Sequence, residues 1–142
     1  MTRNSAELRL PEELLQKADL RGNEYAWHID LIPAVIAAAQ NANLLNVGGQ
    51  LQFRFPDGGT CECYWIAVDT YKSVPANIPW KERVVLAAEF ALREFQALKK
   101  KHDFLSEGRE NFAKHIDAYL ASGGVLNEAM YFVWYVATEE KR

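Results

Sequence analysis

The stretch that decides the fold is residues 47–69, which read VGGQLQFRFPDGGTCECYWIAVD. In its first half, apolar and polar side chains alternate with the two-residue period of a strand that is buried on one side. Residues 56–59, Pro-Asp-Gly-Gly, supply the residue types that tight turns require. The return segment, residues 60–68, is rich in branched and aromatic side chains that pack well on a sheet. We therefore predict a β-hairpin over residues 50–68.

Two segments with helical spacing flank this hairpin. In residues 31–43 the apolar side chains recur every three or four positions, and residues 80–101 form the longest such pattern in the chain. We therefore predict an α+β fold in a single domain spanning residues 1–142. Its small antiparallel sheet is centred on the 50–68 hairpin and packs against three to four helices.

The remaining segments give weaker patterns. In residues 10–20, Pro11 followed by Glu12 and Glu13 is typical of the first turn of a helix, and residues 107–120 also have helical spacing. Residues 130–136 carry conflicting signals, because their branched and aromatic content favours a strand whereas Asn127 before them resembles a helix start. We favour a strand that adds to the hairpin, since an isolated two-stranded hairpin is marginal in water.

Composition limits the classes of function. The chain has 142 residues, of which 49% are hydrophobic and 25% charged, as is ordinary for a soluble globular protein. Its net charge of -3 argues against general attraction to nucleic acid or to an anionic membrane surface. No segment approaches the roughly 20 apolar residues of a membrane-spanning helix, and residues 1–7 lack the apolar core of a secretion signal. We therefore expect a cytoplasmic protein.

The two cysteines lie two positions apart on the predicted return strand. Cys61 and Cys63 then point to the same face with Cα atoms about 6.5 to 7 Å apart, at the outer edge of disulfide geometry. We interpret them as two small buried side chains, with a thiol metal site or redox chemistry as the alternative. A Cys-x-Cys pair supplies only two ligands, and the chain has no second pair to complete a zinc site.

No catalytic motif is assembled by the sequence. The histidines belong to different segments, and the glycine pairs lack the context of phosphate-binding loops. Strand alternation places Glu62 and Asp69 on opposite faces, so they cannot form a carboxylate pair. We therefore expect no metal, no cofactor and no catalytic role. The alternative is a small enzyme or ligand-binding protein with a pocket between helix and sheet near Cys61, Cys63 and His28.

Aromatic side chains are more numerous on and near the hairpin than one sheet needs. Alternation places Cys61, Cys63 and Trp65 on one face of the return strand and Glu62, Tyr64 and Ile66 on the other. If helices cover only the first face, the second exposes aromatics beside carboxylates, a composition typical of protein-binding surfaces. If helices cover both faces, all of these side chains belong to the core.

Several of these motifs together resemble some small bacterial immunity proteins, the antidotes of polymorphic or contact-dependent toxin systems. The resemblance covers residues 25–69 and rests on Trp27 before a helix, on LNVGGQLQF at residues 45–53, on Pro-Asp-Gly at the turn and on the Tyr64-Trp65 pair. It implies a non-catalytic, acidic, cytoplasmic protein that binds a toxin domain and blocks its active site.

Our candidates for contact with a protein partner come from the aromatics and carboxylates of the hairpin region. They are Glu62, Tyr64, Asp69 and Tyr71. We expect no contact with nucleic acid or membrane. Self-association through an exposed sheet edge remains a further possibility.

Overall fold

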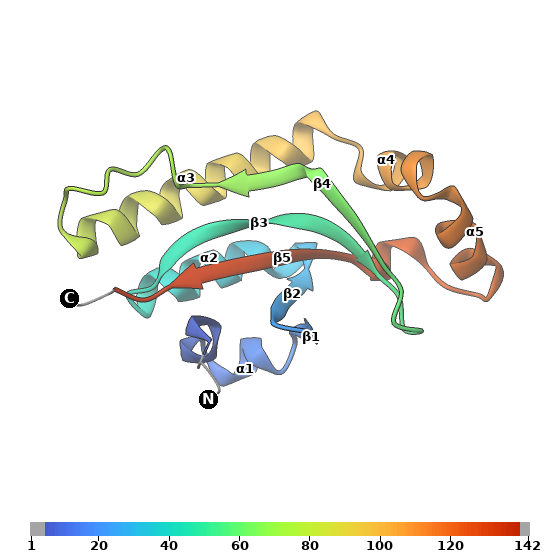
Figure 1. Ribbon diagram of the computed structural model, residues 1–142, viewed down its shortest axis with the longest axis horizontal. Coiled ribbons are helices and arrows are strands. Elements are labelled where there is room, and N and C mark those ends of the chain that lie inside the picture. The colour runs from blue at the N-terminus through green and yellow to red at the C-terminus, as the bar shows by residue number, and fades with distance from the viewer. Residues whose placement is uncertain (1–4, 140–142) are drawn as a thin grey trace.

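A computed structural model describes residues 5–139 of the chain. The expected lack of a secretion signal concerns residues 1–7, of which residues 1–4 lie outside the described part. It contains one five-stranded antiparallel sheet with the strand order β1-β2-β5-β3-β4 (Figure 1). The strands are β1 (Asp19–Arg21), β2 (Glu24–His28), β3 (Leu45–Arg54), β4 (Thr60–Asp69) and β5 (Met130–Ala137). The helices are α1 (Glu12–Leu15), α2 (Ile32–Asn41), α3 (Trp80–Lys101), α4 (Phe104–Asn111) and α5 (Ala113–Ala121). The predicted α+β class is confirmed.

The predicted hairpin is β3–β4, and β5 confirms the strand expected at residues 130–136. β5 pairs with β3 on one side and β2 on the other, so the sheet extends beyond the hairpin by three strands. The helix predicted at residues 10–20 is wrong beyond Leu15, because Asp19 begins a strand. A tight turn at Gly22, whose φ is +61°, folds that strand back onto β2. The helix predicted at residues 107–120 divides at Phe112, whose φ of -132° is not helical.

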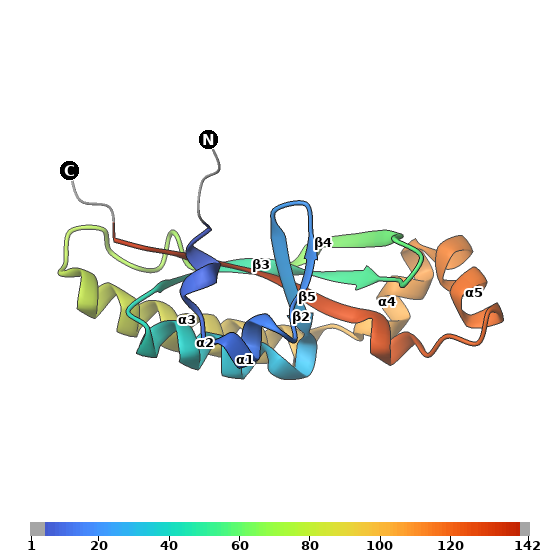
Figure 2. The same ribbon diagram turned by 90° about the horizontal axis from the view of Figure 1, so that it is seen from below.

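The long helices cover one face of the sheet. α3 packs on β3 and β4, while α2 packs on β3 and β5 and against α3. Figure 2 shows α1, α2 and α3 together on one side, whereas the β1–β2 hairpin projects to the opposite side. We call the face away from α2 and α3 the outer face.

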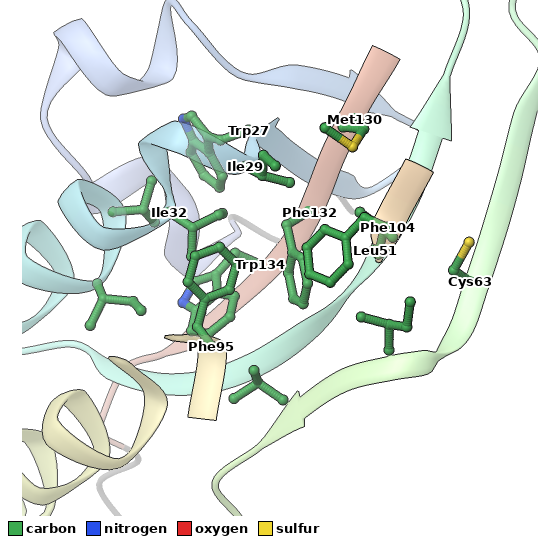
Figure 3. Packing of buried hydrophobic residues seen from close by; sticks show 14 of the residues in the cluster. Trp27, Ile29, Ile32, Leu51, Cys63, Phe95, Phe104, Met130, Phe132 and Trp134 are labelled. Atoms are coloured by element: carbon green, nitrogen blue, oxygen red, sulfur yellow. The ribbon is translucent and has the colours of Figure 1, made fainter. Parts of the chain in front are cut away.

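Between the helices and the sheet lies an aromatic core (Figure 3). The ring of Phe95 from α3 meets that of Phe132 from β5 edge to face, with centroids 5.3 Å apart. Polar contacts are buried with them: the indole Nε1 of Trp134 donates a hydrogen bond to Oδ1 of Asn46 over 2.8 Å. The amide nitrogen of Asn46 in turn donates to the carbonyl of Ile36, which joins β5, β3 and α2.

A bulge in β4 changes which side chains share a face. Leu51 pairs with Cys63, and its neighbour Gln50 pairs with Ala67. Residues 64–66 of β4 therefore lie between two pairs that are consecutive on β3 and have no partner on that strand. The alternation therefore shifts, and Ile66, predicted on the face of Glu62 and Tyr64, is buried under the helices. The same shift puts Glu62 and Asp69 on one face, so the prediction that they lie on opposite faces is wrong.

β3 is unusually close to both neighbouring strands at its glycines. A Cβ atom on Gly49 would lie 1.5 Å from the carbonyl oxygen of Val133, and one on Gly48 would lie 2.0 Å from that of Val68. Gly48 also has φ of +137°, in the region that favours glycine. Both residues lie inside β3, where the absence of a side chain permits the close approach.

Candidate functional site

The candidate site is the outer face along β4 and the start of the following loop. Glu62, Tyr64 and Asp69 all project from this face and are exposed, and Tyr64 is 74% exposed. Tyr71, in the loop after β4, is 83% exposed. Oδ1 of Asp69 accepts a hydrogen bond from the backbone N–H of Tyr71 over 2.9 Å, so the carboxylate fixes the loop that carries this tyrosine. The structure thus leaves all four predicted residues exposed, three of them on the outer face of β4 and Tyr71 in the loop that follows.

Tyr64 lies in the bulge of β4, next to an anchored tryptophan. The neighbouring indole of Trp65 is partly buried, lies nearly parallel to the ring of Phe112 and donates from Nε1 to Oε1 of Glu107 over 3.0 Å. Tyr64 packs edge to face on this anchored indole, with ring centroids 5.3 Å apart. Its phenol is therefore supported from below while its outward side remains free.

Beside β4 on the outer face lies a set of charged and polar residues that sequence analysis did not single out. We call it the outer-face polar cluster; its members are Asp19, Arg21, Glu24, Gln52, Arg54, Glu62 and Tyr135. Gln52 is fully buried and Arg54 is 3% exposed, although both point away from the helices. A buried guanidinium is costly unless it is paired and hydrogen-bonded.

Arg54 meets that requirement through several partners. Nη1 donates to the backbone carbonyl of Asp19 over 2.6 Å and to its carboxylate Oδ2 over 3.1 Å, and it approaches the carbonyl of Glu24 at 3.5 Å. Nε donates to the side-chain oxygen of Gln52 over 2.9 Å. The β1–β2 hairpin therefore supplies most of the acceptors that hold Arg54.

The direction of the Gln52 amide follows from this contact. Arg54 has only donors, so the amide oxygen must face it and the amide NH2 must point the other way. There Nε2 donates to Oε1 of Glu62 over 3.3 Å. An oriented chain of hydrogen bonds thus runs from β1 through β3 to the exposed carboxylate on β4.

Arg21 closes the outer side of the cluster. Its Nε donates to Oδ2 of Asp19 over 2.9 Å, and its Nη atoms donate to the carbonyls of Phe55 and Gly59 and to the hydroxyl of Thr60. These contacts fasten β1 to the β3–β4 turn, although β1 and β4 are opposite ends of the sheet order. Both guanidiniums of the cluster are thereby engaged within the protein.

Tyr135 completes the cluster from β5. Its hydroxyl donates to Oε2 of Glu24, and burial, followed by this hydrogen bond and by the charges of Glu24 and Glu62, raises the pKa of the phenol well above its ordinary value. The positive charge of Arg54 opposes that rise. The phenol therefore stays protonated at neutral pH and acts as a hydrogen-bond donor.

The residues of the alternative pocket are not brought together. Cys61 and Cys63 are free thiols in the core, and burial raises the pKa of Cys61 and, with smaller contributions from Cys61 and Glu107, that of Cys63 to about 12. His28 lies at the end of β2, where Nε2 donates to the carbonyl of Asn127 over 2.8 Å and Nδ1 accepts from the N–H of Asp30. Neither thiol forms the thiolate that nucleophilic chemistry needs near neutral pH.

A different histidine and carboxylate lie near Cys63. Nδ1 of His102 donates to the carboxylate of Glu107 over 2.9 Å, and Glu107 also accepts the Trp65 indole bond. The group does not amount to a catalytic set, because the Cys63 side chain is fully buried and its pKa is raised. It instead joins the end of α3 to α4 and to the β4 bulge.

Two open hollows lie elsewhere on the described part of the chain, and the second borders the polar cluster through Phe55 and Gly59. One, of about 570 Å³, is lined by Lys99, Lys100, Lys101, His102 and neighbouring apolar residues at the end of α3. The other, of about 530 Å³, lies between the β3–β4 turn and α5. Neither is lined by a cysteine or by His28.

Comparison with family models, with curated proteins and with solved structures finds no match to this chain. Within residues 5–139, no group of three or more His, Cys, Asp or Glu side chains is arranged to hold a metal ion. In the same part of the chain, none of the helices has the length and apolar character needed to cross a bilayer.

Proposed function

We propose that this protein binds another protein through its outer face and has no catalytic role, as an immunity protein that neutralises a cognate bacterial toxin. One observation carries the proposal: in the described part of the chain the long helices cover only the inner face, which leaves Tyr64 exposed between two carboxylates on the outer face.

The side chains of this surface suit protein recognition. Tyrosine combines a large apolar ring with a polar tip and loses little conformational freedom on binding, which explains its prominence in interface hot spots. Because Tyr64 already rests on the indole of Trp65, it would lose still less. Its position on the sheet, rather than on a flexible loop, supports a pre-formed docking surface.

Charge supports a basic partner. Both guanidiniums of the outer-face polar cluster are engaged internally, whereas the carboxylates of Glu62 and Asp69 face outward. A surface of this kind speeds association with a positively charged partner, and the effect weakens as salt is added. A toxin domain that binds a polyanionic substrate would present such a surface around its active site, and a bound immunity protein would cover it. The compartment in which this happens would be the cytoplasm.

The test is co-purification with candidate toxin domains, above all with the product of any neighbouring open reading frame. We expect a complex of nanomolar affinity that abolishes the activity of the purified toxin, and growth protection when both are produced together. A toxin domain from an unrelated system serves as the control and should neither bind nor be inhibited. Absence of a nanomolar complex with the neighbouring toxin, or a complex that leaves the toxin fully active, would refute the proposal.

A further inference from the structure

We propose that Glu62 is the anchor of this surface and binds a guanidinium group of the partner, and that Gln52 and Arg54 are positioning residues that hold its carboxylate in place. The inference rests on the proposed function, because it names the chemistry that the same surface recognises. Glu62 is an exposed carboxylate whose hydrogen-bond partner, Gln52, is buried. Among the described residues, no other carboxylate on the outer face of β4 has such a partner.

The first step of the argument is fixed geometry. An exposed glutamate normally samples several rotamers, and fixing them costs free energy on binding. Here Oε1 of Glu62 accepts from Nε2 of Gln52, a side chain that is fully buried and cannot turn over because Arg54 holds its oxygen. Part of the ordering cost is therefore already met before a partner arrives.

The second step is the direction of charge. The cation of Arg54 lies inside the protein and is paired with Asp19, while the carboxylate of Glu62 lies at the surface. Between them, the Gln52 amide presents its donor end to Glu62. The exposed end of this chain is therefore an acceptor, and its second oxygen, Oε2, remains available to donors from outside.

The third step is the neighbour of Glu62 on the strand. Tyr64 lies two residues further along β4 on the same face, so their Cα atoms are separated by about 6.5 to 7 Å. A carboxylate beside an aromatic face fits a planar guanidinium, which donates two hydrogen bonds in its plane and stacks on a ring. The compact ammonium of lysine gains less from this arrangement, so the surface should favour arginine.

A purely structural role does not account for the Glu62 contact. Besides the pairing of β2 with β5, the ties between the β1–β2 hairpin and the rest of the sheet run through Arg54 and Arg21 and through the bond from Tyr135 to Glu24. Glu62 takes no part in them. Its bond to Gln52 joins opposite residues of β3 and β4, two strands that the backbone ladder of the hairpin already holds together, so its main effect is to position the carboxylate.

The probe is an acetylated tetra-arginine peptide, which is added to the full-length 15N-labelled protein at low salt while NMR records the protein resonances. A tetra-lysine peptide of the same length is the control. We expect the arginine peptide to shift the side-chain amide resonance of Gln52 and the backbone resonances around Glu62 and Tyr64. E62Q should weaken binding roughly three- to tenfold, as loss of a charge-assisted pair predicts. Q52M, which removes the positioning amide at similar volume, should weaken it less. E94Q, which changes an exposed carboxylate on the helical side, should have no effect.

A second readout separates positioning from general stability. In the absence of peptide, the side-chain amide resonance of Gln52 should move in E62Q, which changes the acceptor of its hydrogen bond, and should stay in place in E94Q. The inference is overturned if the peptide binds E62Q as well as wild type, if its shifts map to another face, or if the Gln52 amide does not respond to Glu62. A toxin complex that survives E62Q unchanged would refute the anchor and leave the proposed function standing. Peptide binding at Glu62 without any toxin complex would support the anchor and refute the proposed function.

Discussion

The guanidinium of Arg54 on β3 and the carboxylate of Asp19 on β1 meet over 3.1 Å, although two other strands separate β3 from β1 in the sheet. The β1–β2 hairpin must fold over the outer face for this contact to form, as its projection in Figure 2 shows. The hairpin therefore closes one side of the surface on which Glu62 and Tyr64 are exposed. Stability and the proposed binding function are coupled through this pair.

Loss of that pair should destabilise the protein and loosen the hairpin. In R54A the carboxylate of Asp19, which is one-third exposed, keeps Arg21, so we expect a loss of about 2 to 3 kcal/mol rather than the full cost of a deeply buried pair. Urea unfolding of R54A and of the wild type measures this loss in the free energy of unfolding. R93A, at an exposed position on α3, is the control and should cost less than about 0.5 kcal/mol. A loss of the same small size for R54A would show that the network does not hold the hairpin.

The close approach of β3 to β5 makes a second prediction. In G49A the new methyl group would meet the Val133 carbonyl at 1.5 Å, which the sheet can relieve only by separating the strands. We expect loss of more than about 3 kcal/mol, or no folded protein. The matched control is G58A. Gly58 has φ of +98°, but nothing lies within 4 Å of a Cβ atom placed there, so this variant should lose about 1 to 2 kcal/mol of stability. Equal thermal stability of the two variants would contradict the observed strand spacing.

The pattern of the sequence was sufficient for the β3–β4 hairpin, for α2 and α3, and for the strand at β5. Each is long enough for one period to dominate. The β1–β2 hairpin was missed because its strands have three and five residues, too few to display a period, and because a helix-start signal precedes them. Its charged residues contact partners at least 30 positions further along the chain: Arg54 for Asp19 and Glu24, and Phe55 for Arg21.

For the site, the sequence indicated the exposed residues but not what supports them. Glu62, Tyr64, Asp69 and Tyr71 were chosen for their chemistry, and all four are exposed. That Glu62 and Asp69 share a face depends on the β4 bulge, which local alternation does not reveal. Gln52 looked like an ordinary solvent-facing residue, since its burial depends on the hairpin that folds over it.

A buried polar pair in the core gives a third prediction. In N46A, Nε1 of Trp134 loses its acceptor and the carbonyl of Ile36 loses a donor, both in the interior. A buried donor without a partner costs about 1 to 3 kcal/mol, to which the lost packing adds, so we expect about 3 kcal/mol in total. N41A, exposed at the end of α2, should change little. A core that tolerates N46A within about 0.5 kcal/mol would mean that water or another group satisfies the indole.

The thiols give a prediction about pH. Burial raises the pKa of Cys63 to about 12, whereas in the unfolded chain it is about 8.5. The unfolded state therefore ionises first, so the thiol leaves stability unchanged below about pH 8.5 and lowers it as the pH rises toward 12. Between pH 8 and 10.5 the free energy of unfolding of the wild type should fall more steeply than that of C63A. Identical slopes would mean that Cys63 ionises as readily in the folded protein, which would favour the enzyme alternative.

The central claim, that the outer face along β4 is the surface bound by the partner, is tested most directly by the affinity of Y64A for the toxin domain. Tyr64 is 74% exposed, so its truncation leaves the fold intact. The account predicts binding at least about tenfold weaker than wild type, as for a central aromatic contact, while E94A on the helical side binds normally. If Y64A binds within about twofold of wild type and E94A is the variant that fails, the partner docks on the helical side and the account is wrong.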